Sequence, residues 1–148
     1  MFNFTTKLIL AVSVLVLGGV SAANAQLADG SAIKVNVPTA FVVSNSTFEA
    51  GTYTIARTPS TIDSPSLMIL RGDNGSTMVF DTMIASSKQA AGETELIFDS
   101  VGGTNFLSKI VVKGTTSVNE LHKTKTQKKA VTDGVSSVYV VTITNTGF

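Results

Sequence analysis

Apolar and polar residues alternate along much of the chain, which is the pattern of half-buried β-strands. The first alternation runs from Ile33 to Val43 and keeps the same parity on both sides of Pro38. This pattern predicts one long strand bent at Pro38, or two strands that meet there. Because proline cannot donate a backbone hydrogen bond, we expect this strand to lie at the edge of a sheet.

Two later stretches indicate β-hairpins. The apolar run from Leu67 to Leu70 leads into Asp73-Asn74-Gly75, and a second alternation follows this turn. Asn and Gly tolerate the positive φ angles that tight hairpin turns require. Further along, Gly102-Gly103 separates two more alternating stretches. We predict that Phe98 and Phe106, which flank this second turn, both point into the core.

A last strand is predicted over residues 138–144, with Tyr139, Val141 and Ile143 on one face. The segment 117–130 has thinly spaced apolar residues, so helix, strand and loop all stay open for it. The pattern gives seven or eight short strands separated by glycine turns. It predicts an all-β fold, built as a single antiparallel β-sandwich or small barrel that covers residues 26–148.

The first 25 residues have the composition of a signal peptide. Lys7 supplies the positive start, an apolar run extends from Leu8 to Val20, and Ala23-Asn24-Ala25 gives the small-x-small cleavage pattern. The apolar run is shorter than the ~20 residues that a membrane-spanning helix needs. We therefore predict cleavage after Ala25. The domain that remains should be periplasmic or extracellular and should not span a membrane.

Several blocks of the mature chain carry a family resemblance. Val35-Asn36-Val37-Pro38 precedes Phe48-Glu49-Ala50-Gly51-Thr52-Tyr53, and Leu96-Ile97-Phe98-Asp99-Ser100 and Glu120-Leu121-His122-Lys123 follow in order. With these blocks the chain resembles an uncharacterised family of small secreted all-β proteins, common in acidobacteria and related soil bacteria. Val101-Gly102-Gly103 stands where that family often has an aromatic Tyr-Gly-Asp turn. The resemblance implies the fold and export, and it brings no biochemical activity with it.

Composition excludes several kinds of chemistry. The chain has no Cys and one His, which excludes disulfides, Cys-based zinc sites and His-cluster metal sites. We expect no cofactor. The single histidine, His122, lies beside lysines that would disfavour the imidazolium a catalytic base must form, so we interpret it as a surface residue. Glu93 and Glu95 share one strand face and indicate solvated surface more than a catalytic carboxylate pair. Asp73-Asn74-Gly75 lacks the later ligands of a calcium loop.

The one charge asymmetry lies between residues 109 and 129, where six lysines accompany a single acid, Glu120. One interpretation is a solvated, solubilising segment. The other is weak contact with an anionic envelope polymer or an acidic protein, through Lys123, Lys125, Lys128 and Lys129. No aromatic side chains are interleaved with these lysines, which argues against a nucleic-acid partner. The overall balance of 11 basic and 10 acidic residues argues the same way.

These observations predict a non-catalytic secreted or periplasmic β-domain of unknown molecular function that acts as a structural or binding module. Two alternatives stay open. One is a small hydrolase or isomerase that works with carboxylates alone. The other is a minimal outer-membrane β-barrel, suggested by an alternating strand that leads to a terminal Phe148.

Overall fold

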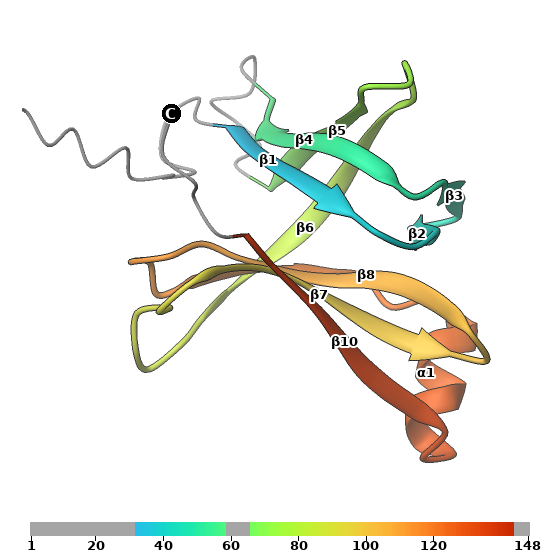
Figure 1. The fold of residues 1–148 in the computed structure, drawn as a ribbon. Coiled ribbons are helices and arrows are strands. Elements are labelled where there is room, and N and C mark those ends of the chain that lie inside the picture. The colour runs from blue at the N-terminus through green and yellow to red at the C-terminus, as the bar shows by residue number, and fades with distance from the viewer. Residues whose placement is uncertain (1–31, 59–65, 144–148) are drawn as a thin grey trace, which may run out of the picture.

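The computed structural model describes residues 32–58 and 66–143 of the chain (Figure 1). The strands are β1 (Ala32–Val37), β2 (Phe41–Val43), β3 (Ser46–Phe48), β4 (Gly51–Arg57), β5 (Leu67–Gly72), β6 (Thr77–Ser86), β7 (Thr94–Val101), β8 (Thr104–Val111), β9 (Ser117–Leu121) and β10 (Ser136–Ile143). One helix, α1 (Lys125–Thr132), precedes the last strand. The predicted signal segment with its cleavage at Ala25 lies outside the described residues, as does Phe148.

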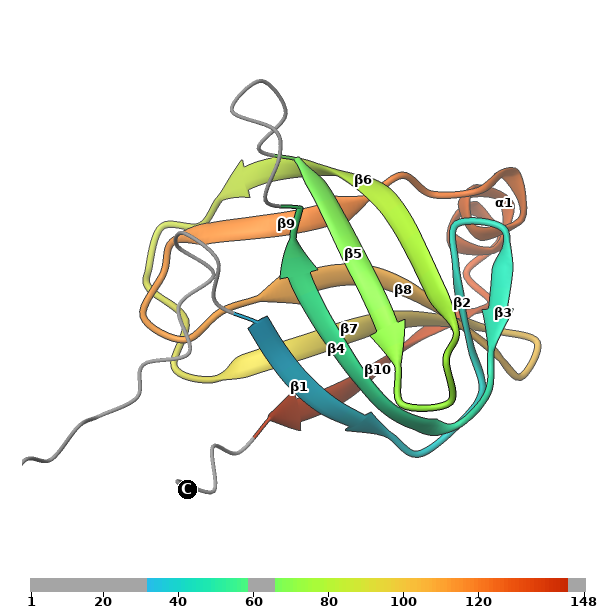
Figure 2. The ribbon, with the colours of Figure 1, turned by 90° about the horizontal axis from the view of Figure 1, so that it is seen from above.

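The strands form two layers that share one strand. The first half of β6 pairs with β5 in the layer β1-β4-β5-β6, and its second half pairs with β9 in the layer β6-β9-β8-β7-β10. Figures 1 and 2 show the two layers stacked, with β1 and β10 as their edge strands on the same side of the molecule. The sheet is not closed, because β1 and β10 do not pair in the described part of the chain. The all-β sandwich-like prediction is confirmed, with ten described strands where seven or eight were expected.

The predicted bend at Pro38 is a change of layer. β1 ends at Val37 and pairs with β4 alone, as the edge position of a proline-flanked strand requires. After Pro38 the chain crosses to the other layer, where β2 pairs with β8 in parallel, Phe41 with Asn105 and Val42 with Phe106. This is the one parallel pair among the described strands, so the sheet is mixed and not wholly antiparallel.

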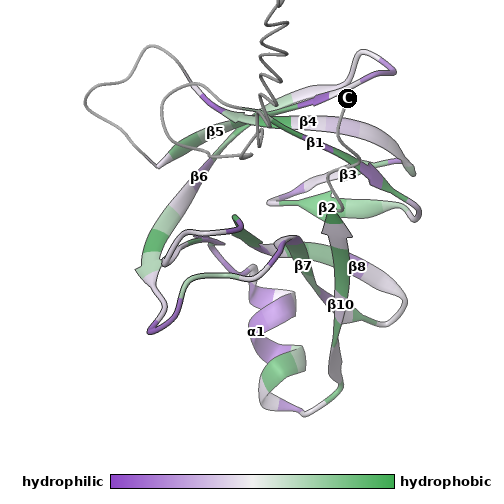
Figure 3. Ribbon diagram, turned by 60° about the vertical axis from the view of Figure 1, so that its left-hand side comes forward, coloured by the Kyte–Doolittle hydropathy of each residue, from purple (hydrophilic) through white to green (hydrophobic). Residues whose placement is uncertain are grey.

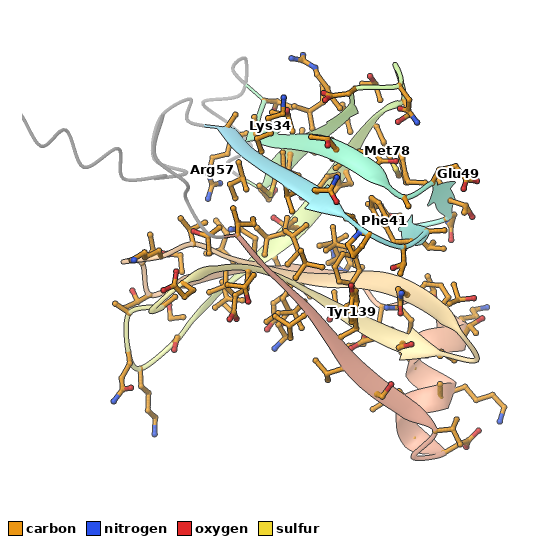
Figure 4. The ribbon with its side chains drawn as sticks, viewed as in Figure 1. Lys34, Phe41, Glu49, Arg57, Met78 and Tyr139 are labelled. Carbon is orange, nitrogen blue, oxygen red and sulfur yellow. The ribbon has the colours of Figure 1, made fainter. Side chains whose placement is uncertain are left out.

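The core lies between the two layers and is organised around aromatic rings. The ring of Phe41 packs edge-on against Tyr53 at a centroid distance of 5.0 Å and against Phe98 at 5.7 Å. Phe48 stacks on Phe41 at 5.5 Å. Such edge-to-face and offset pairs add stability beyond the apolar area that they bury. Figure 4 shows Phe41 and Tyr139 between the layers, and Figure 3 shows hydrophobic residues along the strands of both layers, whereas α1 is largely hydrophilic.

The β5–β6 hairpin has the structure that its sequence predicts. Gly75 adopts φ +88°, and the Asn74 side-chain oxygen accepts hydrogen bonds from the backbone N–H of Ser76 at 3.0 Å and from its hydroxyl at 2.6 Å. The register from Leu67 opposite Asp81 to Arg71 opposite Thr77 is unbroken. Alternation in the sequence therefore translates directly into alternation of faces.

The β7–β8 hairpin departs from its prediction. Gly102 and Gly103 both have positive φ, as a two-residue hairpin turn requires. The register then shifts: Phe98 faces Leu107, but Ile97 faces Lys109, so that Ser108 is an extra residue in β8. This β-bulge reverses the parity of the strand. Phe98 is fully buried, but Phe106 is only half-buried and lies on the opposite face of β8 from the core residue Leu107. The prediction that Phe106 points inward is wrong for that reason.

The undecided segment 117–130 contains two elements, β9 and the start of α1. Thr124 caps the helix, because its hydroxyl accepts from the N–H of Gln127 at 3.2 Å and the Gln127 side chain accepts from the N–H of Thr124 at 2.9 Å. The helix ends at Thr132 with Asp133 as its C-cap, and the φ of +68° at the following Gly134 allows the N–H of Val135 to reach the carbonyl of Ala130 at 3.0 Å. No helix in the described ranges is long and apolar enough to cross a membrane.

Candidate functional site

The four lysines predicted to contact an anionic partner have different environments. Lys123 Nζ lies 3.0 Å from a carboxylate oxygen of Asp99, and Lys129 Nζ lies 2.6 Å from one of Asp133. Lys125 and Lys128 are exposed on α1. Two of the four positive charges are thus already balanced by neighbouring acids, and the positive surface that the helix offers is concentrated at Lys125 and Lys128.

Asp99 and Gln127 form a buried polar contact that the sequence pattern did not indicate. Asp99 is on the outer face of β7, and its side chain is 11% exposed. The Gln127 side-chain amide donates to the Asp99 carboxylate at 3.4 Å while its oxygen caps the helix. Buried polar groups are costly unless they find partners, so this contact fixes α1 on the outer face of β7. Thr124-x-x-Gln127 is the sequence signal that could have predicted this helix start.

A groove lies on the outer face of the second layer. It is lined by residues of β6, β9, β8 and β7 and of the β6–β7 loop, and Figure 2 shows this loop at the end of the layer opposite α1. Its volume is about 500 Å³, inside the ~300–1,000 Å³ typical of small-molecule sites. Its floor is made by the apolar side chains of Ala85, Ile97, Val111 and Val118.

One wall of the groove is the loop between β6 and β7, and backbone hydrogen bonds fix this loop in place. The N–H of Ser87 donates to the carbonyl of Thr116 at 2.7 Å, and the N–H of Ala91 donates to that of Thr115 at 3.0 Å. The N–H of Gly114 returns a bond to the carbonyl of Ala91 at 2.8 Å. The loop is therefore held against the β8–β9 turn, and the groove is formed before any ligand arrives.

An ion pair lies in the groove beside the apolar floor. Lys109 Nζ is 3.0 Å from a carboxylate oxygen of Glu120, and the two residues are opposite one another in the β8–β9 register. Their side chains are 42% and 32% exposed, so both can contact a bound molecule. The groove thus combines an apolar surface with one fixed positive and one fixed negative group. Sequence reasoning missed this site because its residues come from four strands. The only local signal was Glu120, the single acid among the lysines.

The other residues that the sequence singled out lie apart from this ion pair. His122 is exposed, in the short connection between β9 and α1. Glu93 lies 3.9 Å from Lys113 across exposed surface, and Asp73 in the β5–β6 turn lies 3.7 Å from Lys34. In the ranges that the structure describes, no group of three or more His, Asp or Glu residues could hold a metal ion.

The likeness to small secreted all-β proteins of soil bacteria stays a prediction from the quoted sequence blocks. No protein-family model, no curated protein and no solved structure matches this chain.

Proposed function

We propose that this protein is an exported, non-catalytic β-domain that binds a small amphipathic molecule in the groove formed by β6, β9, β8, β7 and the β6–β7 loop. The single observation that carries the proposal is the groove itself, about 500 Å³ in volume with a fixed wall. Concave, preformed sites with an apolar lining and a few oriented polar groups are the usual form of small-molecule sites.

The lining indicates the chemistry of the ligand. Val111, Val118 and Ile97 favour an apolar body, because each removes that body from water. The Lys109–Glu120 pair at 3.0 Å offers a donor and an acceptor at a fixed separation, which suits a polar or zwitterionic group. Ser86, Gln89 and Thr115 add neutral hydrogen-bonding groups around the groove. A molecule with one apolar side and one polar end fits this arrangement.

Binding is tested by filling the groove. Ala90 is an exposed residue of the wall, and Ala50 is also an exposed alanine, between β3 and β4 and outside the groove. Native mass spectrometry of protein purified from its source organism should detect a small molecule bound to the wild type and to Ala50→Trp, and lost in Ala90→Trp. Equal occupancy in all three proteins would exclude the groove as the site.

The non-catalytic part of the proposal has its own test. We expect ester and polysaccharide substrates to be left unchanged by the wild-type protein. Turnover that Ala90→Trp abolishes and Ala50→Trp retains would make the groove an active site and would overturn this part of the proposal.

Export is tested by intact mass. The signal-like segment that ends at Ala25 supports a mature chain that begins at Gln26. Protein recovered from the periplasm or the medium should have the mass of residues 26–148. A chain found there with Met1 still attached would contradict cleavage at this position.

A further inference from the structure

The strand β10 forms an edge of the second layer. All eight of its residues pair with β7, from Ser136 opposite Val101 to Ile143 opposite Thr94. Among the described strands it has no second neighbour. One side of β10 therefore presents backbone N–H and C=O groups that another strand could pair with.

This edge lacks the features that keep edge strands from pairing. Residues 136–143 contain no charged residue and no proline, and the β7–β10 register has no bulge. The other edge strands in the described ranges are protected: β1 carries Lys34, whose ammonium group lies 3.7 Å from Asp73, and β3 has only three residues. Among these edges, β10 is the one that is both long and uncharged.

Two valines on the outer face of β10 are exposed to an unusual degree. Val138 is 68% exposed and Val140 is 42% exposed, while Tyr139 and Val141 between and beside them pack against the core. Exposed apolar side chains in a row on an edge strand indicate an interaction surface more than an isolated apolar residue does.

We propose that β10 pairs antiparallel with β10 of a second copy of this chain, around a two-fold axis perpendicular to the sheet. Such an axis keeps the faces of the two strands aligned, so Val138 and Val140 lie beside their counterparts in the copy. An uncharged strand can meet itself without placing like charges opposite one another. This self-compatibility is the reason to expect a second copy rather than a strand of another protein. The second layers of the two copies then form one continuous sheet.

The proposal is tested by the mass of the protein in solution. Light scattering after size-exclusion chromatography should give twice the monomer mass for the wild type at high concentration and a return to the monomer on dilution. The double variant Val138→Lys/Val140→Lys should be monomeric, because four ammonium groups would face one another across the axis. Both positions are exposed, so the circular dichroism spectrum of the fold should be retained.

The matched control is Val79→Lys/Val131→Lys. It makes the same change in charge at two valines that are 51% and 46% exposed on β6 and α1. This control should remain dimeric. The proposal is overturned by a wild type that is monomeric at every concentration, or by a control that dissociates as readily as the edge variant. Hydrogen exchange on the wild type gives a second measurement that needs no variant: the amides of β10 should exchange more slowly at high concentration, and rates independent of concentration would also overturn it.

Discussion

The hairpins β5–β6 and β7–β8 carry similar sequence signals and have different structures. Each has alternating strands joined by a turn that contains glycine at positive φ. In β5–β6 the register is unbroken, so each residue keeps the face that its parity assigns. In β7–β8 the extra residue Ser108 reverses the parity of half of β8. One inserted residue decides which side chains enter the core, and the alternation of the sequence does not reveal it.

The outer faces of the two hairpins differ as well. On β5–β6 the outer face meets solvent, with Val79 51% exposed. On β7–β8 the outer face is covered by α1 at Asp99, and it lines the groove at Ile97. The outer face of the second layer therefore carries the α1 contact and the groove of the proposed function, whereas the described part of the outer face of β5–β6 is open to solvent.

The largest expected effect distinguishes the two phenylalanines of the β7–β8 hairpin. Phe98→Ala should lower the free energy of unfolding by ~3–5 kcal/mol, because it opens a cavity beside Phe41. Phe106→Ala should cost less than about 2 kcal/mol, because its half-buried side chain leaves no enclosed cavity. Urea denaturation of the two variants measures both values. Equal costs would mean that the parity of β8 continues and that Ser108 is not a bulge.

The glycines of the two hairpins should respond differently to a larger side chain. A Cβ at Gly72 would meet Asn74, Ser76 and, at 2.9 Å, the buried ring of Tyr53, so Gly72→Ala should cost about 1–3 kcal/mol. Gly103 has open space and φ +82°, so Gly103→Ala should cost about 1–2 kcal/mol from backbone strain alone.

Asparagine separates these two causes. It tolerates positive φ, so Gly103→Asn should be more stable than Gly103→Ala. It is larger than alanine, so Gly72→Asn should be less stable than Gly72→Ala. Thermal unfolding of the four variants distinguishes steric contact from backbone strain. If the Asn and Ala variants had the same order of stability at both sites, a single cause would act in both hairpins.

The contact that holds α1 on the outer face of β7 is tested at Lys123. Lys123→Gln removes the charge partner of the Asp99 carboxylate, which is 11% exposed, and should cost about 1–2 kcal/mol after allowance for the partial exposure of the lysine. Lys128→Gln on the exposed side of α1 should change stability by less than about 0.5 kcal/mol. Denaturation of the two variants beside the wild type measures both changes in the free energy of unfolding. If the two variants were equally stable, the Lys123–Asp99 pair would contribute nothing to holding α1.

The smallest effect concerns the predicted anionic contact. Lys125→Gln/Lys128→Gln should elute from an anionic polysaccharide column at lower salt than the wild type, with unchanged stability, because these two lysines have the exposed charges of α1. Lys129→Gln should change elution less, since Lys129 is paired with Asp133 at 2.6 Å. Elution of all three proteins at the same salt would leave the segment as a solvated helix.

Local features of this protein were predictable because neighbouring residues determine them. The alternation from Ile33 to Val43, the Asp73-Asn74-Gly75 turn and the Gly102-Gly103 turn each depend on the conformational preferences of a few adjacent residues. They were sufficient for the all-β class and for most of the strands. The split of 117–130 into β9 and α1 was left open, although the Thr124–Gln127 capping box is itself a local signal.

The tertiary structure alone decided what depends on residues far apart in the chain. The Ser108 bulge follows from how β8 fits against both β7 and β9, and the parallel pairing of β2 with β8 follows from where the chain crosses after Pro38. The groove needs four strands and a loop held by bonds to residues 115 and 116. No stretch of sequence contains these contacts. They depend on the packing of the two layers around Phe41, Tyr53 and Phe98, because this packing fixes which residues are left on the outer face.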